Sequence, residues 1–248
     1  LIMASISPYE NILGHRHAKH LLRRATYVQN KTTIDETALK TVDQAVEDLF
    51  VIPDFLIPEP IDPETSQHFI NIGVTPSSPN FKLKRYIRGW WINEALQDFS
   101  IAHKVQFFLH SIFITNSNSG QPRQNFDYLT LFRQTASRYT NGSFEMDSFK
   151  NLALKIITDN VMLSYLNGNA NTKISPNENF SREFLELFTI GKGEQIGPGD
   201  YTNYTENDIV EGAKLLTGWK NRNRPFGPGG DPAHTDSDTG IQRGDPVY

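Results

Sequence analysis

Four charged side chains gather in residues 175–191 (SPNENFSREFLELFTIG), and their spacing suits two kinds of chemistry. Glu183 and Glu186 lie three residues apart, the spacing at which a helix in a dimetal protein presents its ligands. Glu178, Arg182 and Glu186 follow one another at intervals of four, the spacing of ion pairs along a helix. A dimetal site also needs a partner helix with an ExxH motif, which the sequence lacks. The pattern leaves both interpretations open and favours the ion-pair network.

His110 is the second candidate for chemistry, because it lies in the most apolar segment of the chain, residues 101–115. An imidazole titrates near neutral pH, so His110 can act as a general base or a ligand facing the glutamates. His103 lies seven residues earlier, on the same side of a helix. A core histidine bonded to a backbone carbonyl is the favoured alternative. The candidate catalytic residues are therefore His110, Glu183 and Glu186.

Two further patterns resemble metal sites but are incomplete. His15, His17 and His20 lie close together, but four cationic side chains crowd them, which favours a basic helix face. Residues 236–240 begin like a calcium loop and then lack the later ligands. We therefore expect no bound metal and no cofactor.

The charged stretch also predicts a structural network. An arginine flanked by carboxylates, on an apolar helix and beside an Asn-rich loop, is expected to be partly buried. We expect Arg182 to hold the loop at residues 167–173 and the N-terminal arm against this helix. The predicted network comprises Arg23, Arg24, Lys173, Asn177, Glu178, Asn179 and Arg182.

The helix that carries these residues has clear start and stop signals. Ser175 suits the N-cap, Pro176 the first helical position, and Glu178 the third position of a capping box. Gly191 suits the left-handed residue at the C-terminus. We expect the apolar faces of this helix and of residues 101–115 to form the core. The side chains expected to be buried are Phe107, Phe108, Phe113, Phe180, Phe184, Leu187 and Phe188.

The remaining segments predict further helices and long loops. Thr41 and Thr205 each begin a capping box, completed by Gln44 and Asp208. Apolar side chains recur at helical spacing in several other segments, and no convincing strand pair is found. We predict an all-α protein of about eight helices around one core, with little or no β-sheet. The expected organisation is a single domain over residues 1–248, with a Pro-rich loop at 53–80 and an irregular segment at 219–248.

Composition excludes some function classes. The chain has 248 residues, a net charge of −4 and no cysteine, which excludes disulfides and thiolate chemistry. The negative charge argues against a nucleic-acid-binding surface. No apolar run is long enough for a transmembrane helix, and the first residues do not resemble a signal peptide. The abrupt ends suggest the N-terminal part of a longer chain. Compartment and oligomeric state are not determined by these features.

Six motifs in a fixed order resemble the bacterial domain-of-unknown-function 1800 family. They are HLLRRAT, KVQFFLHSIFIT, MLSYLNG, PNENFSREFLELFTIG, YTENDI and LLTGW. The resemblance covers about residues 20–240, and the fourth motif is highly specific. It implies a longer protein, frequent export from the cell, and a genomic neighbour from a second exported family. It implies no established activity.

Two departures from the family pattern bear on the site. The family's buried helix usually carries a Trp-His-x-His run, whereas this chain reads Leu109, His110, Ser111 and Ile112. A role that depends on the histidine pair is therefore not carried over to His110. The turn before YTENDI is also longer than usual, because it includes residues 197–199.

Three functions remain as hypotheses. The first is a non-catalytic helical scaffold that works with a protein partner, supported by the absence of a complete catalytic constellation and by the genomic neighbour. The second is a hydrolase or metal enzyme that uses His110 with Glu183 and Glu186. The third is a carbohydrate-binding or surface-binding module that uses the tryptophans and the long loops.

Overall fold

The computed structural model describes residues 9–51, 57–70, 78–116, 118–137, 148–220, 233–235 and 242–243. These residues are mostly helical, and their strands are only two or three residues long, which confirms the all-α prediction. Ten α-helices lie in this part of the chain, more than the predicted eight. The periodicity did not predict α2 (Lys31–Ala38), because its buried residues are only Thr37 and Ala38.

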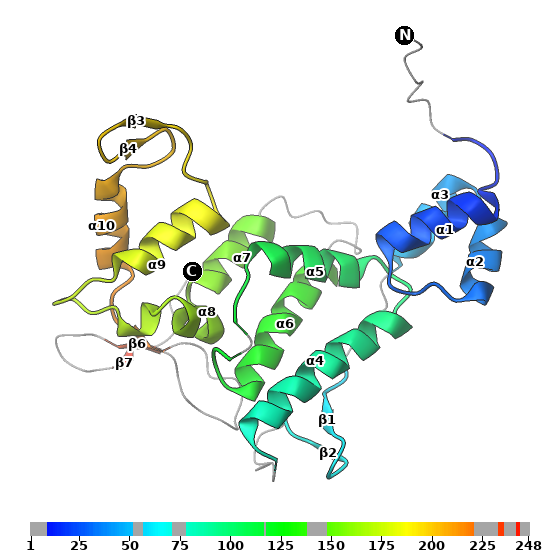
Figure 1. The fold of residues 1–248 in the computed structure, drawn as a ribbon, viewed down its shortest axis with the longest axis horizontal. Helices are drawn as coiled ribbons and strands as arrows, with labels where there is room; N and C mark the ends of the chain where they lie inside the picture. Colours follow the sequence, from blue (N-terminus) through cyan, green and yellow to red (C-terminus); the bar gives the residue numbers. More distant parts are fainter. Residues whose placement is uncertain are drawn as a thin grey trace.

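The helices form three groups along the long axis of the molecule (Figure 1). One end holds α1 (Gly14–Ala25), α2 and α3 (Val42–Phe50). The middle holds α4 (Asn80–Gln97), α5 (Ala102–Ile112), α6 (Pro122–Ser137), α7 (Ser148–Ile157) and α8 (Asn160–Tyr165). The other end holds α9 (Glu178–Glu183) and α10 (Glu206–Leu215). No described helix combines the length and the apolar character that crossing a membrane requires.

Short antiparallel strand pairs form within some of the loops. The Pro-rich loop contains a hairpin of β1 (Ile61–Asp62) and β2 (Gln67–His68). A second hairpin pairs β3 (Gln195–Gly197) with β4 (Asp200–Tyr201), and β5 (Trp219–Lys220) pairs with β6 (Ala233–Thr235), which pairs with β7 (Gln242–Arg243). The expectation of no strand pair is therefore wrong. Strands of this length cannot show an alternating pattern in the sequence.

The buried hydrophobic side chains of the described residues form separate clusters along the molecule. The largest joins α5, α6, α7, α8 and α9 through Phe113, Phe132, Phe180 and Phe188. A second lies between α4, α6 and the hairpin, and includes Phe69 and Leu83. Two smaller clusters lie largely among α1, α2 and α3. The prediction of one core is too simple, because an elongated row of helix groups cannot share one centre.

Three predicted core residues are on the surface. Phe107, Phe108 and Leu187 are 51%, 60% and 59% exposed, whereas Phe184 is partly buried against the main cluster. Helix α5 turns His103 and Gln106 inward instead. A helix that is apolar almost all round carries no sequence signal for its inner face, so packing against neighbouring helices decides it.

Candidate functional site

An open groove of about 590 Å³ lies between α4 and the loop that leads into the β1–β2 hairpin. Tyr86 and Trp90 give the helix side aromatic character, and Arg85, Asn93 and Glu94 give it polar groups. The groove residues from the loop are Pro58, Glu59, Ile61 and Pro63. Such a mixture of apolar rings and a few polar groups is typical of ligand sites.

The groove exists because one face of α4 binds the loop. Residues 85, 86, 89, 90, 93 and 94 recur at helical spacing and so share a face. Trp90 Nε1 donates a hydrogen bond to the Pro58 carbonyl oxygen at 2.8 Å. Tyr86 Oη donates to Glu64 Oε1 at 3.1 Å, and Lys82 Nζ donates to the same oxygen at 2.7 Å. These bonds hold the loop beside the helix without filling the space between them.

A smaller inner pocket of about 30 Å³ adjoins the groove. The two spaces have Pro58, Trp90 and Glu94 in common. The inner pocket is formed by the last turns of α4, the first turns of α5 and the C-terminal half of α6. Its other lining residues are Ile57, Trp91, Asp98, His103, Gln106 and Arg133.

A buried ion pair forms one wall of the inner pocket. Arg133 Nη2 donates to Asp98 Oδ2 at 2.7 Å, and both side chains are almost completely buried. The backbone N–H of Ser100 donates to Asp98 Oδ1 at 2.8 Å. Each charge would be costly to bury alone, whereas together they cancel. The wall is therefore polar without a strong net charge.

His103 contacts this pair as a neutral side chain. Its Nε2 lies 3.4 Å from Asp98 Oδ2. Burial, and then the positive charge of Arg133, lower the pKa of His103 to about 4, against the opposing effect of Asp98. Burial also raises the pKa of Glu94 at the entrance. At neutral pH the pocket therefore contains an uncharged imidazole beside a balanced ion pair.

Three residues that line the inner pocket each have a buried polar atom without a hydrogen-bond partner in the structure: Trp91 Nε1, His103 Nδ1 and Gln106 Oε1. His103 is 6% exposed and Gln106 is 1% exposed. The Gln106 side chain acts to raise the pKa of His103, but no hydrogen bond of normal geometry joins the two. An unmade buried hydrogen bond costs about 1–3 kcal/mol, so three at one pocket call for a functional explanation.

His110 lies elsewhere on α5, among aromatic rings. Its ring centroid is 5.7 Å from that of Trp91, 5.8 Å from that of Phe132 and 6.2 Å from that of Tyr128. Burial alone lowers its pKa. The structure does not bring His110 together with Glu183 and Glu186. No group of His, Asp or Glu side chains arranged to hold a metal occurs among the residues described.

The acidic helix begins later than predicted. Its N-cap is Asn177, whose Oδ1 accepts from the backbone N–H of Asn179 at 3.1 Å. Ser175 is instead engaged with Thr172 in a turn, so it cannot cap the helix. The α-helix passes into a π-helix, η3 (Phe184–Phe188). Gly191, three residues after its end, has a φ of 71°, the left-handed conformation predicted for that glycine.

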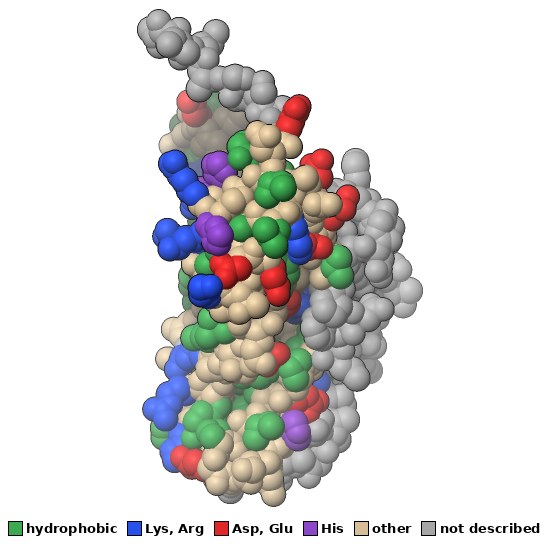
Figure 2. Space-filling model, turned by 90° about the vertical axis from the view of Figure 1, so that its right-hand side faces the viewer, with side chains coloured by type: hydrophobic (Ala, Val, Ile, Leu, Met, Phe, Trp, Pro, Cys, Tyr) green, Lys and Arg blue, Asp and Glu red, His purple; other side chains and the backbone are tan. Residues whose placement is uncertain are grey.

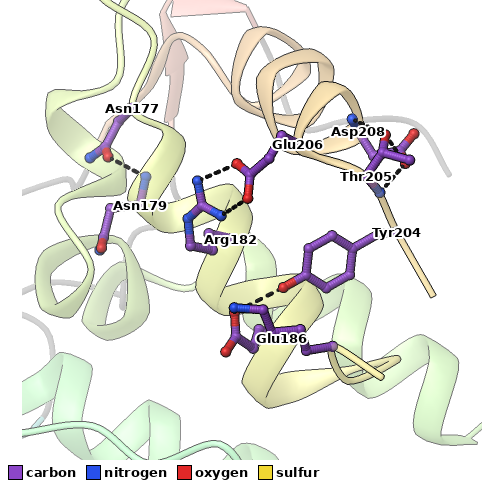
Figure 3. Close-up of polar contacts among 9 residues, drawn as sticks. Asn177, Asn179, Arg182, Glu186, Tyr204, Thr205, Glu206 and Asp208 are labelled. Atoms are coloured by element: carbon purple, nitrogen blue, oxygen red, sulfur yellow. Dashed lines mark hydrogen bonds and ion pairs between the residues drawn. The ribbon is translucent and has the colours of Figure 1, made fainter. Parts of the chain in front are cut away.

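Arg182 is paired across helices and not along its own helix (Figure 3). Both terminal nitrogens donate to the carboxylate of Glu206 on α10, each at 2.7 Å. Glu186 accepts from Tyr204 Oη at 2.8 Å, and Glu178 is exposed. The side chains of Arg182 and Glu206 are about one-third exposed, which agrees with the expectation of a partly buried arginine. The contacts clamp α9 and η3 to α10, which makes them structural.

Asn171, which sequence reasoning did not single out, organises the Asn-rich loop. It is completely buried; its Nδ2 donates to the Ala213 carbonyl oxygen, and its Oδ1 accepts from the backbone N–H of Asn177, both at 2.8 Å. Asn177 Nδ2 donates to the Asn167 carbonyl oxygen at 2.8 Å. Lys173 and Asn179 are exposed to solvent. Part of the predicted network therefore holds this loop to α9 and α10.

Arg23 and Arg24 do not belong to this network. They lie on α1, at the opposite end of the molecule from α9 (Figure 1). Both are exposed, as are Arg16 and Lys19 on the same helix. Figure 2 shows this end of the molecule, where Lys and Arg side chains gather along one edge. The expected contact between the N-terminal arm and α9 is wrong, because the intervening helix group separates them.

Comparison with known proteins identifies the family. The description "Protein of unknown function (DUF1800)" applies to the family model that matches residues 20–242. The chain belongs to the DUF1800 family. No curated protein and no solved structure matches it. The match covers the groove, the inner pocket and the clamped helices, so all three lie within the family region.

The inner pocket contains the residues that sequence reasoning missed. Asp98, Gln106 and Arg133 come from three separate segments, and no local spacing connects them. The available signal was weak: His103 and Gln106 are polar residues on a strongly apolar helix. A polar residue at a core position indicates an internal hydrogen-bonded site, but it does not name its partners.

Proposed function

We propose that this DUF1800 protein is a carbohydrate-binding module whose ligand lies in the groove along α4. The observation that carries the proposal is the pairing of Trp90 and Tyr86 with the Pro-rich loop around an open space. The tryptophans and this loop are also the elements that the sequence suggested for such a role.

The chemistry of the groove suits a sugar better than a charged or purely apolar ligand. A sugar ring has apolar C–H faces that pack on aromatic rings and hydroxyl groups that exchange hydrogen bonds with polar side chains. Arg85, Asn93 and Glu94 lie within a few turns of the two rings and supply donors and acceptors. The groove lining contains one cation, Arg85, and two carboxylates, Glu59 and Glu94, so its net charge is only −1.

Glycan-array binding by the purified chain tests the proposal. We expect specific glycans to bind, and the double variant Arg85→Ala/Asn93→Ala to weaken binding about ten-fold or more, since each lost hydrogen bond lowers affinity several-fold. Both side chains are exposed, so the fold should survive. Arg88→Ala is the matched control, because it removes the same charge from α4 outside the groove. An array without binding, or equal binding by the double variant, contradicts the proposal.

A second proposal, a scaffold that works with a protein partner, is supported by the outer face of α5. Phe107 and Phe108 are adjacent and more than half exposed, and Ile114 just beyond the helix is 52% exposed. Exposed apolar side chains that lie together mark interaction surfaces. We expect Phe107→Ser/Phe108→Ser to abolish stoichiometric co-purification of a partner from the source cells while leaving glycan binding intact. Unchanged co-purification would remove this face from consideration.

A further inference from the structure

The inner pocket lies outside the groove itself, and its three unpartnered atoms define what it can hold. Gln106 Nε2 donates to the Leu129 carbonyl oxygen at 2.9 Å, which fixes the amide so that Oε1 remains a free acceptor. The carboxylate of Asp98, 3.4 Å from His103 Nε2, favours the tautomer with the proton on that nitrogen. His103 Nδ1 is then a second acceptor. Trp91 Nε1 is always a donor.

An occupant must therefore accept one hydrogen bond and donate at least one. A hydroxyl group or a water molecule does both. A carboxylate or phosphate oxygen meets two acceptors and is excluded by them. A cation meets the Trp91 donor and gains nothing from Asp98, whose charge Arg133 already balances.

The size of the pocket restricts the occupant further. A volume of about 30 Å³ accommodates one water molecule or a group of similar size, and not a sugar ring. The pocket has Pro58, Trp90 and Glu94 in common with the groove, so a group attached to a ligand in the groove can reach it. A hydroxymethyl group meets both conditions, since it is small and ends in a hydroxyl.

We infer that the inner pocket is a hydroxyl-binding subsite, in which Trp91 Nε1 donates to the hydroxymethyl oxygen of a ligand and Gln106 Oε1 or His103 Nδ1 accepts its proton. This inference deepens the proposed carbohydrate function and rests on it for the identity of the ligand. A water molecule takes the same place when no ligand is bound. The subsite would select sugars that carry a free primary hydroxyl.

Indole N–H signals in a ¹⁵N-correlation NMR spectrum test the subsite directly in the full chain. The protein has three tryptophans, so Trp91 is assigned by the Trp91→Phe variant and Trp219 serves as an internal control. The probes are methanol, which donates and accepts, and acetonitrile, which only accepts. We expect the Trp91 signal to move and saturate with methanol, while acetonitrile has little effect and Trp219 does not respond.

The variant Gln106→Leu removes one acceptor. It should weaken the affinity for methanol, measured from the titration of the Trp91 signal, about five-fold, in line with one lost hydrogen bond. Equal responses to the two probes, or an unchanged response in this variant, would overturn the subsite. If Gln106→Leu fails to fold, the imidazole ¹⁵N signals of wild-type His103 decide. A proton on Nδ1 at neutral pH would contradict the assigned acceptor.

The two levels of proposal fail separately. A glycan found on the array is compared with its analogue in which a methyl group replaces the hydroxymethyl group, and about ten-fold weaker binding of the analogue is expected. Equal binding of the pair overturns the subsite but leaves the groove as the binding site. An empty array together with a saturating methanol response overturns the carbohydrate function and leaves the hydroxyl subsite for another class of ligand.

Discussion

Helices α9 and α10 are in such close contact at Gly212 that adding a single methyl group there should push them apart. A Cβ atom built on Gly212 would lie 2.3 Å from Ser181 Oγ, whereas ordinary contacts are 3.4–4 Å. Ser181 is buried, so its hydroxyl has little room to move away. The substitution Gly212→Ala therefore tests how tightly the two helices pack.

Two opposing effects set the expected magnitude. Replacing a helical glycine by alanine stabilises a protein by about 1 kcal/mol, through helix propensity. Forcing an extra methyl group into a packed interface costs about 1–3 kcal/mol. We expect the second effect to win, with a net loss of about 1 kcal/mol. The variant Ser181→Ala removes the hydroxyl, so the nearest atom of residue 181 to the added Cβ is its own Cβ, at 3.5 Å. In this background Gly212→Ala should become stabilising.

The assay is urea denaturation followed by tryptophan fluorescence, with the midpoint compared at constant m-value. Gly89→Ala on α4 is the matched control: Gly89 is also helical, but its added Cβ would meet nothing within 4 Å, so stability should rise by about 1 kcal/mol. If Gly212→Ala stabilises the chain as much as Gly89→Ala does, the close contact is not rigid and this reasoning is refuted.

Two further predictions concern buried polar side chains. Asn171→Ala should lower the free energy of unfolding by about 2–4 kcal/mol, because it leaves the buried Ala213 carbonyl and the partly buried Asn177 N–H without their partner. Denaturation should show almost no loss for the exposed control Asn179→Ala, and a small loss for both variants would contradict the clamp. The pKa of His103 is about 4 in the folded protein and 6.5 in the unfolded chain. The unfolded chain therefore takes up the proton first as the pH falls below 6.5. The free energy of unfolding is highest above pH 6.5, and up to about 3 kcal/mol of it is lost as the pH falls to about 4. His103→Gln should show a flatter stability–pH profile than wild type over that interval, and parallel profiles would contradict the assignment.

Much of the helical architecture could be predicted because its signals are local. The capping boxes of Thr41 and Thr205 form as expected, since each joins residues three positions apart. Gly191 adopts its left-handed conformation for the same reason. Ser175 failed as a cap because a competing turn with Thr172 takes its backbone groups, and local patterns do not rank such competitors.

The candidate site depended on tertiary structure. The sequence by itself determined that an apolar helix lies within residues 101–115 and that His103 and His110 share one side of it. Only packing against α4 and α6 decided that His103 faces Asp98 and Arg133, which lie five residues before it and thirty residues after it. Arg182 shows the same limit, because its partner is Glu206 on another helix and not Glu178 or Glu186. Spacing along a chain specifies which side chains share a face, whereas the partner of a face is set by how the helices pack.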